Sequence, residues 1–144
     1  MKKDIRTEIE INASAEKVWN ILSDFEAFPS WNPFVIKAVG EPKEGARLAI
    51  EVQLPEAQKL NFTPVVLKAE PNKELRWVGT MPIGMFRGEH FYVIEPIGEN
   101  KIRFVHGEHF SGWLVRLIWL MVGKQTEKGY RIMNEALKKR AENL

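Results

Sequence analysis

The sequence predicts an α+β fold in which a curved antiparallel sheet carries helices on one face. Residues 35–110 read as consecutive strands, several of them joined by tight turns. Helical patterns occur only near the two ends of the chain. Strands grouped in a run between terminal helices are typical of the α+β class. A long last helix across such a sheet leaves room for a ligand wherever side chains do not fill the gap.

A strand and a short helix open the chain. Residues 5–11 alternate between apolar and polar side chains, as a strand with one buried face does. Ser14 can cap the helix that follows, and Glu16 in its first turn is favourable beside the helix dipole. This helix, residues 14–24, has one apolar face that collects Ala15, Val18, Trp19 and Leu22.

The segment Phe28–Phe34, FPSWNPF, combines three aromatic residues with two prolines. Pro29 and Pro33 fix the backbone φ angle and prevent a long regular helix, while the rings supply large apolar faces. The result is a stiff apolar segment directly after the first helix. One interpretation is that its rings only fill the core, and the other is that they face a ligand.

Six strands and a long helix complete the chain. The strands are expected at residues 35–39, 48–54, 62–69, 74–80, 86–95 and 101–110. Glu70–Lys73 and Pro96–Asn100 contain turn-forming residues and should close two hairpins. The last helix is expected from Trp113 to Glu142, because charged residues repeat along one side of it with the helical period.

Composition restricts the class of protein. The 144 residues fit a single domain, 1–144, and 44% hydrophobic with 28% charged residues is ordinary for a globular protein. The formal net charge is +2 and acidic residues are interspersed with basic ones, which argues against nucleic-acid binding. No cysteine is present, which excludes disulfides and thiol nucleophiles. The first residues lack the apolar run of a secretory signal, and no segment is apolar enough to span a membrane, so we expect a cytoplasmic protein.

Three polar residues are expected to meet on the inner face of the second hairpin. If its turn centres on Gly98, His90 lies opposite His106. Glu108 then lies opposite Gly88, one pair further along, on the same otherwise apolar side of the pleat. Two imidazoles and a carboxylate in an apolar surrounding are suited to proton exchange near neutral pH. Acid/base catalysis, hydrogen bonds that orient a ligand, and an internal network without such a role all remain open.

The start of the last helix carries more apolar residues than one buried face requires. Ile118, Val122 and Gln125 fall on the expected sheet-facing side. The side that carries the charges should expose three large side chains: Trp113, Leu117 and Leu120. Exposed apolar patches often mark a partner, a membrane surface or a ligand entrance. We therefore expect a homodimer contact or a membrane-surface contact there, with cover by a neighbouring loop as the alternative.

Four separated motifs of the chain resemble those of one known superfamily. They are ASAEKVWNILSDFEAFPSWNPF, ELRWVGTMPIGMFRGEHFYVIEP, RFVHGEHFSGWLV and the final helix, which together cover essentially the whole chain. The superfamily is the START-like (SRPBCC) group, and the chain is most similar to its polyketide cyclase/dehydrase-type members. The resemblance implies a helix-grip fold, in which a curved seven-stranded antiparallel sheet wraps around a long C-terminal helix and two short helices follow the first strand. It also implies that Phe28–Phe34 walls a cavity, with Trp31 the ring most expected to face a ligand.

The resemblance implies that the chain binds a small hydrophobic ligand of lipid-, acyl- or polyketide-like character. The site would be a cavity of ~300–1,000 Å³ between the sheet and the last helix. One alternative is a cyclase/dehydratase-type enzyme with His90, His106 and Glu108 as acid/base groups. The other is an interaction or membrane-docking module that uses the patch around Trp113. Neither a metal nor a cofactor is expected. The side chains expected around the ligand are Trp31, Phe34, Phe62, Trp77, Met81, Met85, Phe86, His90, Tyr92, Phe104, His106, Glu108, Phe110, Ile118, Val122 and Gln125.

Overall fold

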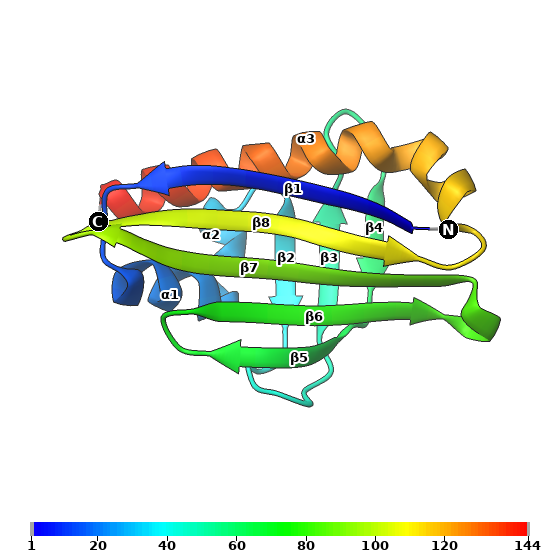
Figure 1. Ribbon diagram of the computed structural model, residues 1–144, viewed down its shortest axis with the longest axis horizontal. Coiled ribbons are helices and arrows are strands. Elements are labelled where there is room, and N and C mark those ends of the chain that lie inside the picture. The colour runs from blue at the N-terminus through cyan, green and yellow to red at the C-terminus, as the bar shows by residue number, and fades with distance from the viewer. Residues whose placement is uncertain (1, 144) are drawn as a thin grey trace.

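The computed structural model describes residues 2–143 and has the predicted helix-grip architecture (Figure 1). The long helix α3 runs alongside β1, at one edge of a twisted sheet, and the strands β2, β3 and β4 cross behind that sheet (Figure 1). The elements in chain order are β1 (Lys2–Ile11), α1 (Ala15–Ser23), η1 (Phe25–Ala27), α2 (Phe28–Trp31), β2 (Val35–Val39), β3 (Ala49–Gln53), β4 (Lys59–Phe62), β5 (Val65–Glu70), β6 (Glu74–Met81), η2 (Pro82–Gly84), β7 (Phe86–Gly98), β8 (Lys101–Ser111) and α3 (Val115–Glu142).

The strands form two antiparallel sheets where the sequence predicted one sheet of seven strands. The larger sheet has five strands in the order β1-β8-β7-β6-β5, and the smaller has three in the order β2-β3-β4. A β-bridge between Arg47 and Val65 links the segment before β3 to the start of β5. The extra strand is β4, which lies almost wholly before the predicted strand 62–69. The rest of that predicted strand forms β5, which begins after Pro64, a residue with no N–H to donate to a ladder.

Short helical segments follow β1, as predicted. Ser14 caps α1, because its Oγ accepts a hydrogen bond from Lys17 N at 3.1 Å. After α2 the chain turns sharply into β2. The Asn32 side chain holds this turn, since its Oδ1 accepts hydrogen bonds from Phe34 N (3.0 Å) and Val35 N (2.9 Å).

β7 and β8 pair two residues away from the predicted register. His90 lies opposite Glu108 instead of His106, so Gly88 is not the partner of Glu108 either. The prediction centred the turn on Gly98, whereas β7 continues through Gly98 and a bulge interrupts the ladder just before it. Because the shift is an even number of residues, every side chain of the hairpin keeps its predicted face of the sheet.

The two halves of α3 pack differently. Of residues 115–128, only Val115 and Gly123 are buried. The second half buries a continuous stripe against the sheet and α1, made of Gly129, Tyr130, Met133, Asn134, Leu137 and Ala141. Packing of an apolar face supplies most of the stability of a helix in a protein. The C-terminal half is therefore the anchored part of α3.

Gly129 lets the Phe34 ring lie directly against α3. A Cβ at this position would overlap two atoms of the ring. Phe34 is buried, and its ring meets the Tyr130 ring edge-on with centroids 5.4 Å apart, so it has little room to move aside. At Gly123, in contrast, an added Cβ would meet the Trp119 side chain of the same helix at 3.1 Å.

We expect Gly129→Ala to lower the free energy of unfolding by roughly 1–3 kcal/mol. Overpacking of this kind outweighs the ~1 kcal/mol that alanine gains over glycine inside a helix. Gly123→Ala, the matched control, is expected to change the stability less, because a half-buried side chain can adjust. Urea unfolding of both variants measures the difference, and an equal loss in the two would contradict this account of Gly129.

Candidate functional site

Six polar side chains from four elements form one buried hydrogen-bonded chain, called here the polar chain. β1 contributes Thr7, β7 contributes His90, β8 contributes two residues and α3 contributes two. Its members in order are Thr7, Asn134, His106, His90, Tyr130 and Glu108. The three predicted residues of the inner hairpin face thus lie together, but the direct cross-strand pair is His90 with Glu108 and not His90 with His106.

The inner end of the polar chain is closed. Thr7 Oγ1 donates to the main-chain oxygen of His106 at 2.8 Å. Asn134 Nδ2 donates to Thr7 Oγ1 at 2.8 Å, and Asn134 Oδ1 lies 2.8 Å from His106 Nδ1. All three residues are buried, so each of these polar atoms is satisfied by another atom of the protein.

The outer end approaches the surface. His106 Nε2 lies 2.9 Å from His90 Nε2. His90 Nδ1 lies 3.4 Å from the Tyr130 hydroxyl and 3.6 Å from Glu108 Oε1. Tyr130 donates its hydroxyl proton to Glu108 Oε1. The Glu108 side chain remains 15% exposed, so this is the end of the polar chain that a bound molecule can reach.

Aromatic rings enclose the two imidazoles. The Tyr130 ring stacks on His106, with centroids 4.2 Å apart and an angle of 18° between the planes. Trp77 lies against His90 at 5.1 Å, and the Tyr92 ring contacts both histidines at 4.7 and 4.6 Å. These rings hold both imidazoles in fixed orientations and keep water away from them.

Burial sets the protonation of three members of this region. It lowers the pKa of His106 well below the ordinary value of 6.5, and the neighbouring His90 lowers it further. Burial also raises the pKa values of Tyr92 and Tyr130 well above 10, and the Glu108 carboxylate adds to this effect. At neutral pH the His106 ring is therefore uncharged, and both tyrosines keep their hydroxyl protons.

A small apolar pocket of about 20 Å³ lies beside the outer end of the polar chain. The Glu108 carboxylate and the Phe86 ring both lie over Gly88, and Thr126 precedes Tyr130 by about one helical turn. The pocket is formed between the sheet and the N-terminal half of α3, and its lining residues are Phe86, Phe110, Val115, Ile118, Trp119, Val122, Gly123 and Thr126.

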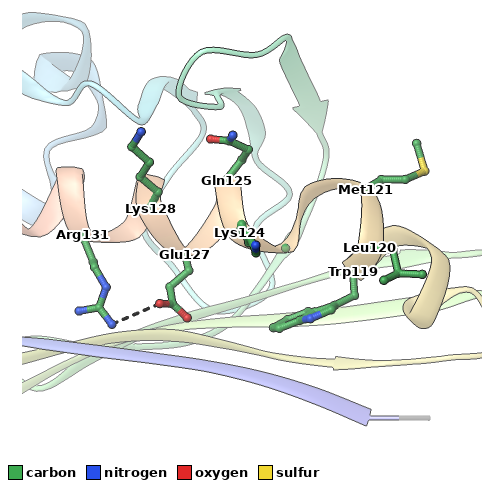
Figure 2. Close-up of a pocket in the computed structure, with 9 residues that line it drawn as sticks. Trp119, Leu120, Met121, Lys124, Gln125, Glu127, Lys128 and Arg131 are labelled. Carbon is green, nitrogen blue, oxygen red and sulfur yellow. Dashed lines mark hydrogen bonds and ion pairs between the residues drawn. The ribbon is translucent and has the colours of Figure 1, made fainter.

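A wider groove of about 500 Å³ is open along the surface of α3 (Figure 2). Gln125 and Lys128 project from one side of the helix, and Glu127 and Arg131 project from the other (Figure 2). Glu127 and Arg131 form an ion pair at 3.3 Å. The lining is rich in charged side chains, so this groove lacks the enclosed apolar character that was expected for the ligand site.

The structure brings ten of the sixteen predicted ligand residues to one region, and Phe34 packs against Tyr130 beside it. Four of them line the small pocket: Phe86, Phe110, Ile118 and Val122. Three belong to the polar chain, namely His90, His106 and Glu108, and Tyr92 contacts both histidines. Trp77 and Phe104 pack against Tyr92, at 5.4 and 5.8 Å between ring centroids. Three of the rings expected to surround a wide cavity, Trp77, Tyr92 and Phe104, are thus packed together, and none of the three lines either pocket.

The remaining five predicted ligand residues lie apart from this region. Trp31 packs edge-on against Phe28, with centroids 5.4 Å apart, and its buried Nε1 has no partner among the described residues. Gln125 lines the open groove. Phe62 is exposed on β4, and Met81 and Met85 flank the short η2 turn.

Sequence reasoning missed three members of the polar chain: Thr7, Tyr130 and Asn134. The signal for the two residues of α3 was present, because positions 130, 134, 137 and 141 repeat with the helical period and form the buried stripe. The predicted sheet-facing side lies about one residue away from this stripe, because it was inferred only as the side opposite the exposed charged residues. Thr7 stands at an inward position of β1, where only its partners on α3 and β8 show its role.

The start of α3 exposes the large side chains that the sequence predicted on its solvent side. Trp113, Leu117 and Leu120 are 64%, 55% and 77% exposed. Ile83 and Met121 are also exposed, and Trp113 Nε1 donates to the main-chain oxygen of Ile83 at 3.1 Å. These five residues are called here the apolar patch. No helix within residues 2–143 is long and apolar enough to cross a membrane.

Comparisons with solved structures show that the chain shares its fold with several known proteins. A START superfamily protein from Mycobacterium smegmatis is 24% identical, with 96% of this chain and 97% of that chain covered and a TM-score of 0.75. The Zhui aromatase/cyclase from Streptomyces sp. R1128 is 13% identical, with 99% and 94% covered and a TM-score of 0.81. Norcoclaurine synthase from Thalictrum flavum, in complex with dopamine and hydroxybenzaldehyde, is 14% identical, with 100% and 89% covered and a TM-score of 0.73.

The family follows from the sequence itself. Residues 2–142 match the family described as polyketide cyclase / dehydrase and lipid transport, and the chain belongs to this family. A comparison with curated proteins finds no match. The predicted resemblance is therefore confirmed at the level of family and fold.

The lowered pKa of His106 predicts a pH dependence of stability. Above pH 6.5 the ring is neutral in both folded and unfolded chains, so its contribution to stability is complete. As the pH falls below 6.5, His106 becomes protonated in the unfolded chain but stays neutral in the folded chain. The free energy of unfolding therefore declines until the pH passes the folded-state pKa of His106. One such proton costs about 1.4 kcal/mol per pH unit.

His106→Gln is expected to remove this part of the slope between pH 6.5 and pH 5. Its stability at pH 8 should be lower than that of the wild type, since packing and hydrogen bonds are lost, but the two curves should converge in acid. Denaturant unfolding at steps of pH measures both curves. Parallel curves over this range would contradict the neutral buried state of His106.

Proposed function

We propose that this protein binds a small hydrophobic molecule between the five-stranded sheet and the N-terminal half of α3. The observation that carries the proposal is the apolar pocket beside the exposed end of the polar chain. Its walls are mostly aromatic and aliphatic, and one wall residue, Phe86, lies with the Glu108 carboxylate over Gly88. A lipid-, acyl- or polyketide-like molecule, apolar with one polar group, has the matching chemistry.

The pocket must widen to take such a molecule. A volume of about 20 Å³ is close to the space for one water molecule, and ligand sites are usually ~300–1,000 Å³. The wall that can move is the N-terminal half of α3, because it buries only Val115 and Gly123 before residue 129. Sparse packing makes local displacement inexpensive compared with unfolding of the anchored half.

The similar structures support a ligand of small size. Norcoclaurine synthase, which has the same fold, contains dopamine and hydroxybenzaldehyde, so this architecture accommodates small aromatic molecules in that protein. The apolar rings around the pocket here, Phe86, Phe110 and Trp119, suit flat or acyl-chain ligands alike.

Filling the pocket should abolish binding. We expect Val122→Trp to weaken binding of a fluorescent apolar probe, 1-anilinonaphthalene-8-sulfonate, by about tenfold or more, because the new ring occupies the space. Ile132→Trp is the control, since Ile132 is 37% exposed and does not line the pocket. Fluorescence titration gives the affinities, and native mass spectrometry of the wild type shows whether an apolar molecule co-purifies. Equal affinities of wild type and Val122→Trp would contradict the proposed location.

A cyclase/dehydratase-type reaction is the second candidate function. The polar chain favours it, since a buried imidazole pair joined to a carboxylate is an arrangement suited to proton transfer. The test is the mass of the molecule released from the wild type and from Glu108→Gln. A product that differs from its precursor by one water would support a dehydration, whereas identical masses would favour binding alone.

The apolar patch suggests that the protein also contacts a lipid surface. The stretch 112–126 that carries most of the patch contains two cations, Arg116 and Lys124, and no acidic residue. Exposed apolar side chains with a basic surrounding favour an anionic membrane surface. A homodimer through Trp113, Leu117 and Leu120 is the other expected use of this surface.

Liposome flotation and sedimentation separate these two uses of the patch. We expect the wild type to float with vesicles that contain phosphatidylglycerol and less with pure phosphatidylcholine. Leu117→Lys/Leu120→Lys should abolish flotation. A wild type that ignores both vesicles but sediments as a dimer, with the double variant monomeric, would overturn membrane contact in favour of self-association.

A further inference from the structure

The hydrogen bonds at the closed end of the polar chain determine where its protons are. Thr7 has a single hydroxyl proton, and that proton is committed to the main-chain oxygen of His106. The Thr7 oxygen must therefore accept from Asn134, which fixes the amide with Nδ2 toward Thr7 and Oδ1 toward His106. An amide oxygen only accepts, so His106 must carry a proton on Nδ1.

The same assignment of protons to hydrogen bonds extends to His90. The two Nε2 atoms are 2.9 Å apart, and a hydrogen bond between them needs one proton. A neutral His106 that is protonated on Nδ1 has a lone pair on Nε2. The proton between the rings therefore belongs to His90 Nε2, and His90 Nδ1 is the one ring nitrogen whose proton this assignment does not fix.

We propose that Thr7 and Asn134 are positioning residues, which fix one proton on His106 Nδ1 and one on His90 Nε2. Of the four ring nitrogens, only His90 Nδ1 is then able to exchange a proton with a bound molecule. His106 is then a fixed acceptor behind His90. His90 Nδ1 and Glu108 are at the end of the polar chain that approaches the surface, and Tyr130 donates its proton to Glu108 there.

The opposite arrangement is disfavoured by two features. It would place the proton on His106 Nε2 and a lone pair on His106 Nδ1, facing the lone pairs of Asn134 Oδ1. Rotation of the amide would repair this contact only if Thr7 released the main-chain oxygen of His106. The burial that keeps His106 uncharged also removes the state in which both of its nitrogens carry protons.

The titratable groups around His90 are few and all come from named elements. β8 supplies Glu108 and His106, β7 supplies Tyr92 and α3 supplies Tyr130. Because Tyr130 gives its proton to Glu108, a proton on His90 Nδ1 would point to Glu108 Oε1, 3.6 Å away. A ligand hydroxyl that reaches this end would give its proton to Nδ1, and the O–H bond electrons would remain on the ligand oxygen. The proton transfer from a ligand rests on the proposed function, whereas the assignment of the protons on His106 and His90 does not.

Nitrogen NMR of the protein with ¹⁵N-labelled histidine tests the proposal without any ligand. Long-range proton–nitrogen correlations distinguish a protonated from an unprotonated ring nitrogen. In the wild type at pH 7.5 we expect His106 to be protonated on Nδ1 and unprotonated on Nε2, and His90 to be protonated on Nε2. A wild-type His106 protonated on Nε2 would overturn the proposal, whatever the ligand experiments show.

Two pairs of variants show whether Thr7 and Asn134 cause this state. Thr7→Val removes the hydroxyl and should give mixed tautomers at both histidines, whereas Thr7→Ser keeps it and should preserve the wild-type pattern. Asn134→Leu removes the acceptor for Nδ1, and Asn134→Asp restores it. The wild-type pattern retained in both Thr7→Val and Asn134→Leu would overturn the positioning role. If Asn134→Leu fails to fold, the Thr7 pair still decides the question.

Discussion

The burial of the polar chain between β1, β7, β8 and α3 is the constraint on which the arrangement of the site depends. A buried donor or acceptor without a partner costs about 1–3 kcal/mol, so Thr7, Asn134 and His106 must meet in one geometry. That geometry fixes the rotation of α3 about its own axis, because Tyr130 and Asn134 have to face the sheet together. The same rotation places Val122 and Thr126 over the small pocket. The position of the small apolar pocket thus follows from the hydrogen bonds that the buried polar chain must form.

The fold was predictable from sequence because the signals that define it are local or periodic. Ser14 caps α1, and the alternation along β7 and β8 correctly assigned the inner face. Pairing was not predictable to the residue, since it depends on a bulge next to Gly98 that the turn composition does not reveal. A register error of two residues changes the cross-strand partner of each residue but leaves its side chain on the same face of the sheet. The two histidines and Glu108 were therefore still predicted together on the inner face.

The candidate site was less predictable, because its contacts join residues far apart in the chain. Asn134 and Thr7 are 127 positions apart, and nothing in the local sequence of either residue shows that they meet. The expected wide cavity depended on how far side chains fill the space between sheet and helix. Volume is a collective property of many rotamers, and here Trp77, Tyr92 and Phe104 contact one another where open space was anticipated. The alternation of polar and apolar residues predicts which face of the sheet is buried, but it does not predict how much open volume remains over that face.

The uneven packing of α3 has a consequence for how its backbone amides exchange hydrogen with solvent. The helix is continuous from Val115 to Glu142, yet its second half is buried and its first half is mostly exposed. Amides of the second half should exchange only through global unfolding, while those of the first half exchange through openings of much lower free energy. A bound molecule under the first half would add its own binding free energy to these openings. Slowed exchange confined to residues 115–128 would thus reveal a ligand even before its chemical identity is known.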